Sequence, residues 1–271
     1  MKKIQIKSLL IISIIFYSNH SFSQFDDRFY YPSKEWKSID SLKYESHFIK
    51  IESDSLNCLF IYPKENAKAT VFYFHGAGGN VSNYIQFIRP LVKNNFNVIM
   101  VDFRGYGKSS GKPSHINVAN DAQIIVDYFI RQDSISTKPI ILYGASLGSQ
   151  IAAHLAKKNS GKIKALILDG GMSSFTDIAL EGTPDAQKEI VKTYVTSPYS
   201  SKEDVQLLDP NTVKLLIIHS KTDSSIPFSH AETVFKNGNK PKSFWIYEGD
   251  HLEAPLKEEQ LFIEKMNELI K

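Results

Sequence analysis

The feature that most constrains the fold is a regular alternation of short apolar runs with helix-length amphipathic segments along most of the chain. The apolar runs are rich in β-branched and aromatic residues, which favour strands. Runs such as Ile140-Ile141-Leu142 lack the alternation of a sheet with one face in water, so helices are expected on both faces. We therefore predict an α/β fold with a mostly parallel eight-stranded sheet and helices on both faces.

The same pattern predicts where the elements lie. Residues 24–43 form an irregular arm over the domain surface, and strands at 47–51 and 57–62 form an opening hairpin. Further strands are predicted at residues 70–74, 97–101, 140–143, 165–168, 215–218 and 243–247, and helices at residues 82–93, 117–131, 146–158, 229–236 and 255–270. Residues 172–210 carry no strand signal and are longer than an ordinary connection, so we predict a small lid there.

The first 23 residues have the pattern of a secretory signal peptide. A basic start is followed by an apolar stretch over residues 8–17, which is shorter than the roughly 20 residues of a membrane-spanning helix. We expect cleavage before Gln24 and export to the periplasm or the extracellular space. The mature chain is then a single domain over residues 24–271 without an integral membrane segment.

Charge gives no reason to expect nucleic acid or an anionic membrane as a partner. The formal net charge is +3, and the expected signal peptide holds three lysines (Lys2, Lys3 and Lys7) and no acidic residue, so the mature chain is formally neutral. Cys58 is the single cysteine and lies in an apolar run, so we expect a buried thiol and no internal disulfide.

Ser146 is the candidate nucleophile. It lies in Gly144-Ala145-Ser146-Leu147-Gly148, between a predicted strand and a predicted helix. A G-x-S-x-G sequence in this context lifts the serine onto a sharp elbow, and its small residues let neighbouring backbone approach closely. Without these flanks the motif is only a glycine-flanked turn.

A second glycine-rich segment supplies a candidate oxyanion hole. His75-Gly76-Ala77-Gly78-Gly79 directly follows the predicted strand at 70–74. Acyl transfer places negative charge on the carbonyl oxygen, and fixed N–H donors stabilise that charge. We assign the donors to the backbone N–H groups of Ala77 and Leu147. A phosphate-binding turn is disfavoured because no G-x-G-x-x-G and no Walker lysine is present.

The candidate acid and base follow the serine in the order Asp223, His251. Each lies just after a predicted strand, in Thr222-Asp223-Ser224 and Gly249-Asp250-His251. Parallel sheets place their sites at the carboxyl ends of strands, and this chain order is the one found with the serine elbow. The predicted catalytic set is therefore Ser146, Asp223 and His251.

The other polar candidates are given lesser roles. Asp102 is expected to hold a glycine-rich turn, Asp169 is an alternative acid, and Asp250 is expected to point away. His75 is expected to brace the oxyanion loop, and His219 and His154 are expected to be packed or hydrogen-bonded. No partner is evident from the sequence for the remaining histidines His47, His115 and His230. The spacing of histidines and carboxylates matches no metal motif, so we expect no metal and no cofactor.

These motifs together resemble the α/β-hydrolase superfamily, in particular its small-lid branch of serine aminopeptidase-like lipases and protein depalmitoylases. The resemblance rests on the serine and oxyanion motifs, on Asp102-Phe103-Arg104-Gly105-Tyr106-Gly107 and on the acid and base loops, over about residues 45–270. It implies this fold and a serine triad, whereas its members include esterases, lipases, thioesterases and peptidases. Two positions depart from the usual pattern, because Ser149 and Ser220 stand where glycine is common.

The resulting hypothesis is a monomeric hydrolase that cleaves a carboxylic ester or thioester through an acyl-enzyme on Ser146. Apolar residues of the predicted lid suggest a small-molecule or lipid-like acyl substrate, or they simply pack on the core; they are Ile178, Leu180, Val191, Tyr194 and Val195. A serine exopeptidase is an alternative, with Glu181 or Asp185 holding the free amine of the substrate. A non-catalytic binding domain of the same fold is the third hypothesis.

Overall fold

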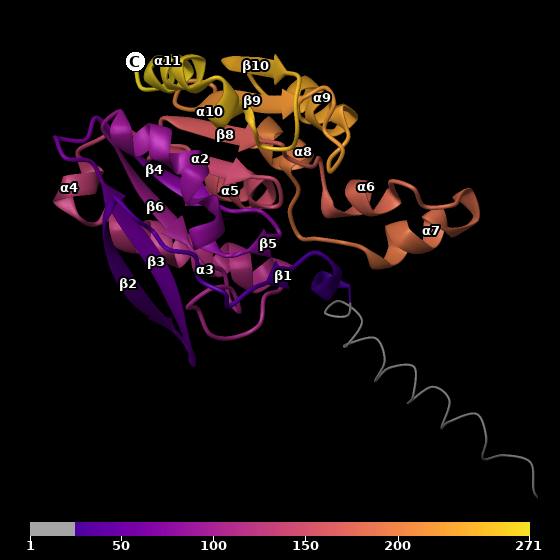
Figure 1. Cartoon of the computed structure of the whole chain (residues 1–271). Helices are drawn as coiled ribbons and strands as arrows, with labels where there is room; N and C mark the ends of the chain where they lie inside the picture. The colour runs from indigo at the N-terminus through magenta and orange to yellow at the C-terminus, as the bar shows by residue number, and fades with distance from the viewer. Residues whose placement is uncertain (1–24) are drawn as a thin grey trace, which may run out of the picture.

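The computed structural model describes residues 25–271, so the predicted signal peptide lies outside the described residues. Its main element is an eight-stranded sheet in the order β10-β9-β8-β7-β4-β6-β3-β2 (Figure 1). The strands are β2 (Lys43–Ile51), β3 (Asp54–Tyr62), β4 (Ala69–Phe74), β6 (Phe96–Val101), β7 (Ile140–Ala145), β8 (Ala165–Asp169), β9 (Lys214–Ser220) and β10 (Lys242–Tyr247). β3 runs antiparallel to β2 and β6, and the other neighbouring strands are parallel. The predicted α/β fold is confirmed.

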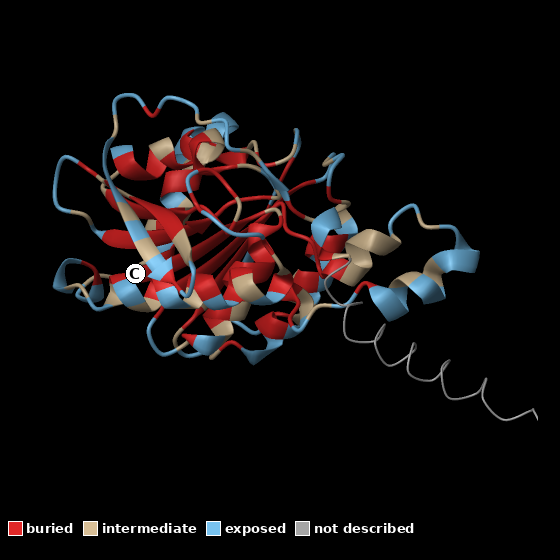
Figure 2. Ribbon diagram, turned by 90° about the horizontal axis from the view of Figure 1, so that it is seen from below, coloured by how far each residue is buried: buried red, intermediate tan, exposed pale blue. Residues whose placement is uncertain are grey.

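Helices cover both faces of the sheet. They are α2 (Val81–Lys93), α3 (His115–Ile130), α4 (Asp133–Ser136), α5 (Gly148–Lys158), α9 (Phe228–Asn237), α10 (Ala254–Lys257) and α11 (Glu259–Leu269). Successive strand residues point to opposite faces, so Phe72 packs with α3 and α5, whereas Val71 and Tyr73 pack with α2 and α11. Both faces of the central strands are buried (Figure 2), which explains why they are apolar without alternation.

The single helix predicted over residues 255–270 is wrong in detail. The structure has two helices there, α10 and α11, which are separated at Glu258. Glu258 has φ −126° and ψ 50°, outside the helical region, so the chain turns between them. The apolar spacing alone could not reveal this break. Within residues 25–271, no helix combines the length and apolar character required to cross a membrane.

The chain between β8 and β9, which we name the insertion, is helical. It carries α6 (Phe175–Leu180), α7 (Asp185–Tyr194), α8 (Ser201–Asp204) and the short 3-10 helix η2 (Val205–Leu207). Figure 1 shows α6 and α7 standing away from the sheet, beyond the carboxyl end of β8. None of the residues of α7 is buried, unlike those of the helices that cover the sheet.

The N-terminal arm is more ordered than its sequence indicates. It begins with the 3-10 helix η1 (Asp26–Arg28) and continues into β1 (Tyr31–Pro32). β1 pairs in parallel with β5 (Gly78–Gly79), directly after the predicted oxyanion residue Ala77. An arm from the start of the chain therefore touches the loop that follows β4.

The turn after β6 is held by buried charge. Asp102 accepts hydrogen bonds from Asn57 Nδ2 at 2.8 Å and from the N–H of Val81 at 2.9 Å, which agrees with its predicted structural role. Arg104 binds both oxygens of Asp121, with Nε–Oδ2 2.6 Å and Nη2–Oδ1 2.9 Å. It also contacts Asp54 at 2.8 Å. These pairs tie β3, the turn and α3 together.

We predict that Arg104→Ala lowers the free energy of unfolding by about 3–5 kcal/mol, because it leaves Asp121 buried without its charged partner. Lys112→Ala is the matched control, since the side chain of Lys112 is 71% exposed and pairs with Asp27 at the surface. That change should cost at most about 1 kcal/mol. Urea titration of both variants measures the difference, and equal losses would contradict the buried pairing.

Candidate active site

Ser146 lies on a strained elbow between β7 and α5. Its φ is +52°, a left-handed conformation that costs energy in a residue with a side chain. Close packing holds the elbow: a Cβ on Gly148 would lie 2.0 Å from the carbonyl oxygen of Phe74, and the N–H of Ser146 donates to Asp169 O at 2.8 Å. The serine side chain is half-buried and remains accessible.

The loop after β4 passes directly over Ser146. A Cβ on Gly76 would lie 3.2 Å from Ser146 Cβ and 2.6 Å from the Tyr84 hydroxyl, so a residue larger than glycine would be crowded beside the serine. His75 is fully buried beneath this loop and its Nδ1 lies 2.7 Å from Gly76 O, which agrees with its predicted bracing role. Within residues 25–271, no acceptor is bound to the backbone N–H of Ala77 or of Leu147. Backbone N–H groups nearly always bind an acceptor. Because these two bind none in the described part of the protein, they can donate to a ligand.

Tyr84 belongs to this region, although the sequence did not single it out. If Gly76 carried a Cβ, that atom would lie 2.6 Å from the Tyr84 hydroxyl and 3.2 Å from Ser146 Cβ. The Tyr84 hydroxyl and the Ser146 side chain therefore flank the same small space beside Gly76. Its ring stacks on His75 at 5.4 Å. A tyrosine in an amphipathic helix resembles any core residue in sequence, so no pattern could have identified it.

Asp223 and His251 come together from consecutive strand ends. His251 Nδ1 lies 2.6 Å from Asp223 Oδ2, and the side chain of Asp223 is 0% exposed while that of His251 is 20% exposed. Burial raises the pKa of Asp223, but hydrogen bonds from His251 and from the N–H groups of Ile226 and Ser225 hold it below its ordinary value. The carboxylate is therefore ionised and fixes the orientation of the imidazole.

Ser220, one of the two departures from glycine, joins these loops. Its Oγ donates to Gly249 O at 2.5 Å and accepts from the N–H of Thr222 at 3.1 Å. The acid loop and the base loop are thus linked two residues before His251. Ser149, the second position where glycine is common, is fully buried. Gly171 makes room for its side chain, because a Cβ on Gly171 would lie 2.7 Å from Ser149 Cβ.

Ser146 and His251 lie on either side of the end of β8. The N–H of Ser146 donates to Asp169 O. Gly170, the residue after Asp169, packs against the imidazole of His251, because a Cβ placed on Gly170 would lie 2.7 Å from His251 Cε1. The elbow, the imidazole and Asp223 therefore lie at the carboxyl ends of neighbouring strands, β7 to β10. The structure joins His251 to Asp223 by a hydrogen bond, and within the described residues none joins Ser146 to His251.

Asp169, the alternative acid, has a different partner. Tyr143 donates its hydroxyl to Asp169 Oδ2 at 2.5 Å, and Oδ1 has no hydrogen-bond partner within the described residues. Complete burial raises the pKa of this carboxyl to about 6. Asp169 is therefore hydrogen-bonded to a tyrosine and, within the described residues, to no histidine.

Three further histidines of the described residues have structural partners. His219 Nε2 lies 2.9 Å from Ile226 O and so braces the acid loop. His115 Nδ1 lies 3.0 Å from the hydroxyl of Tyr30, and His154 Nδ1 lies 3.2 Å from Asp204. Across the described part of the chain, no cluster of histidine, cysteine and carboxylate groups has the arrangement of a metal site.

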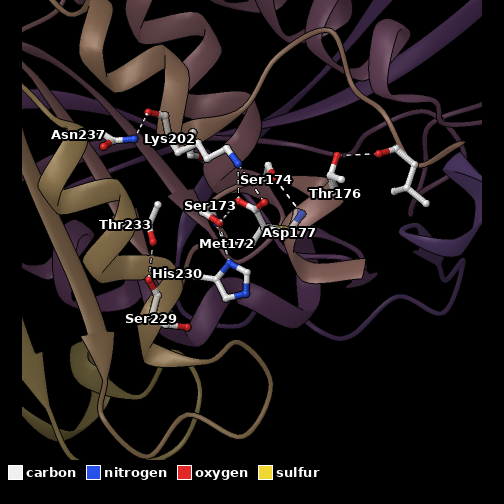
Figure 3. Close-up of polar contacts among 12 residues, drawn as sticks. Met172, Ser173, Ser174, Thr176, Asp177, Lys202, Ser229, His230, Thr233 and Asn237 are labelled. Atoms are coloured by element: carbon white, nitrogen blue, oxygen red, sulfur yellow. Dashed lines mark hydrogen bonds and ion pairs between the residues drawn. The ribbon is translucent and has the colours of Figure 1, made fainter. Parts of the chain in front are cut away.

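A polar cluster ties the root of the insertion to α9 (Figure 3). Ser173 Oγ lies 2.8 Å from His230 Nδ1 and donates to Asp177 at 2.6 Å. Lys202 Nζ binds both oxygens of Asp177 at 2.9 and 2.8 Å. On the other side of His230, Nε2 lies 3.4 Å from Glu181 Oε1. The charge of Asp177 is therefore neutralised within the protein.

We predict that Asp169→Asn changes how stability depends on pH. The native carboxyl has a pKa raised from 3.8 to about 6. Between these two pH values the folded protein holds a proton that the unfolded chain releases, so wild-type stability falls as pH rises from 3.8 to about 6. From pH 3 to pH 7, wild type should lose about 3 kcal/mol relative to the asparagine variant. Chemical denaturation across this range measures the difference, and parallel pH profiles would contradict the raised pKa.

Comparisons with known proteins find relatives of the chain and of its fold. The family described as "Serine aminopeptidase, S33" matches residues 65–195, which include the loop after β4 and Ser146. "Uncharacterized protein YfhR" of Escherichia coli O157:H7 is 31% identical over 233 residues, covering 83% of this chain and 80% of that protein. An alpha-beta hydrolase from Vibrio vulnificus has a TM-score of 0.71 at 21% identity, covering 95% of this chain and 93% of that one. The esterase Pf2001 of Pyrococcus furiosus has a TM-score of 0.68 at 18% identity, covering 88% and 97%.

Proposed function

The chain belongs to the α/β-hydrolase superfamily, and on that premise we propose that it is a serine hydrolase that cleaves carboxylic esters or thioesters through an acyl-enzyme on Ser146. The observation that carries the proposal is the bond of 2.6 Å between His251 and the buried Asp223, at the sheet edge that presents Ser146 in a left-handed elbow. A serine hydroxyl needs such a base, and the base needs a fixed orientation.

The roles follow from the protonation that these contacts favour. His251 Nδ1–H donates to Asp223, which leaves Nε2 free to accept the proton of the Ser146 hydroxyl as its oxygen attacks the acyl carbon. The ionised Asp223 stabilises the imidazolium that forms. His251 then protonates the leaving alcohol or thiol, and later removes a proton from the water that cleaves the acyl-enzyme.

Negative charge on the acyl oxygen would be received by the N–H groups of Ala77 and Leu147. Both are unpaired within residues 25–271, and Leu147 directly precedes α5, so the helix dipole adds to its N–H. Donors that are oriented before the reaction stabilise the transition state without reorganisation. These two unpaired donors are the groups that we propose for the oxyanion hole.

We propose that an apolar acyl group extends from Ser146 into a groove between the arm and the insertion. The groove has a volume of about 460 Å³, and its apolar lining comes from Phe25, Phe29, Ala179, Ile190, Val191, Tyr194 and Val195. Its lining contains none of Ser146, Asp223 and His251. Three of the five apolar residues noted in the sequence, Val191, Tyr194 and Val195, line the groove, and Val195 is also buried. We propose that the insertion acts as the lid and that the protein works after export.

The exopeptidase alternative needs a carboxylate that is free to hold an amine. Asp185 pairs with Lys188 at 2.7 Å at the outer end of the insertion, and Asp177 is neutralised by Lys202. Glu181 is half-exposed and lies beside His230, so it is the remaining candidate.

We predict that Ser146→Ala removes turnover of p-nitrophenyl acyl esters, since the nucleophile is lost. Asp223→Asn should lower kcat by roughly 10⁴-fold, because the imidazole loses the carboxylate that sets its tautomer. Asp250→Asn is the matched control: Asp250 adjoins His251 but is exposed, and it should retain wild-type turnover. A variant with Ser146→Ala that keeps full activity would remove this serine from the mechanism.

We predict that ester turnover rises with acyl length until the groove is filled, since each buried methylene contributes about 0.8 kcal/mol. Aminoacyl p-nitroanilides are the comparison substrates, and Glu181→Gln tests the amine site directly. If kcat/KM is higher for the anilides than for the esters, and Glu181→Gln abolishes this preference, the protein is an exopeptidase.

A further inference from the structure

The carbonyl of Ala77 is held by two groups that are far apart in sequence. Tyr106 donates its hydroxyl to Ala77 O at 2.6 Å, and the N–H of Tyr31 donates to the same oxygen at 2.9 Å. The N–H of Tyr31 also lies 3.0 Å from the Tyr106 hydroxyl, so the three groups form a closed cluster. The turn after β6 and the N-terminal arm therefore meet at one peptide group of the loop.

This peptide group is adjacent to the one that carries the proposed oxyanion donor. Each peptide unit is planar, so the Ala77 N–H lies in one plane with Gly76 O, and the Ala77 carbonyl belongs to the next plane. His75 holds the first plane through Gly76 O, while Tyr106 and Tyr31 hold the second. Both planes that meet at Ala77 are thus fixed, the first by His75 at the start of the loop and the second by Tyr106 and Tyr31 from outside it.

The loop needs this support because its own residues supply little stiffness. Ala77 is flanked by Gly76, Gly78 and Gly79, and Gly79 has φ +83°. Glycine has wide backbone freedom, which has to be removed by external contacts if a donor is to be oriented in advance. Further contacts come from the arm: the N–H of Ser33 donates to Gly79 O at 2.9 Å.

Tyr106 is suited to act as a fixed donor. It is 0% exposed, and its ring packs against His75 at 4.9 Å and edge-on against Phe103 at 5.9 Å. Burial raises the pKa of its hydroxyl well above the ordinary value, so the group keeps its proton. Its contact with His75 means that one side chain supports both peptide planes.

We propose that Tyr106 is a positioning residue of the active site: with the backbone N–H of Tyr31, its hydroxyl holds the Ala77 carbonyl and so orients the Ala77 N–H toward the developing oxyanion. This inference rests on the proposed function, because it assigns a role to a donor of that same site. It also makes the N-terminal arm, which the sequence marks only as irregular, a working part of the site.

The test is Tyr106→Phe in the full chain, which keeps the ring and deletes the donor. We expect kcat for an acyl ester to fall by about tenfold with KM changed by less than about twofold, since the lost support acts in the transition state. A trifluoromethyl ketone with the same acyl group forms a tetrahedral adduct on serine, and its affinity should weaken by the same factor as kcat/KM. Tyr31→Pro, which deletes the second donor, should act in the same direction.

Ser160→Ala is the control, because the Ser160 hydroxyl also donates to a backbone carbonyl, that of Ala156 at 2.9 Å, after the end of α5 and outside the proposed site. It should keep wild-type kcat. Unchanged kcat and ketone affinity in a folded Tyr106→Phe protein, or an equal loss in Ser160→Ala, would overturn the positioning role. Ala77→Pro removes the proposed oxyanion donor and separates the positioning role from the proposed function. If Ala77→Pro and Ser146→Ala both leave turnover unchanged, the proposed function fails. If both lower turnover and Tyr106→Phe does not, only the positioning role fails.

Discussion

The left-handed backbone of Ser146 is the constraint on which the site depends. A side chain at φ +52° persists only where its surroundings hold it, and here β4, β7 and α5 approach so closely that Gly148 has no room for a Cβ beside Phe74. The same close approach brings Gly76 against the serine and carries the chain of β8 to the N–H of Ser146. The geometry around Ser146 is therefore a consequence of how β4, β7, β8 and α5 pack.

Much of this arrangement could be predicted from local sequence. Apolar runs without alternation correctly indicated buried parallel strands, and the flanks of Ser146 indicated an elbow between β7 and α5. Asp223 and His251 were placed together because both follow strands at one sheet edge, and they lie 2.6 Å apart. Such predictions succeed where the chain order and the strand order determine which ends are neighbours.

Contacts between distant segments could not be predicted in this way. Tyr84 and Tyr106 resemble ordinary aromatic residues of a helix and a turn, and only packing brings them to His75. The pairing of β1 with β5 joins residues that are nearly 50 positions apart in a segment without strand pattern. Ser220 is similar, since a serine in place of glycine gives no sign that it links the acid and base loops.

Together these contacts show separate parts of the chain holding the residues that we propose as nucleophile, base and oxyanion donors. The most direct measurement of that claim is to treat the protein with a fluorophosphonate and locate the adduct by peptide mass spectrometry. The account predicts one adduct on Ser146, formed rapidly in the native protein and lost after urea denaturation. No adduct on Ser146, or equal labelling of the native and denatured chains, would contradict it.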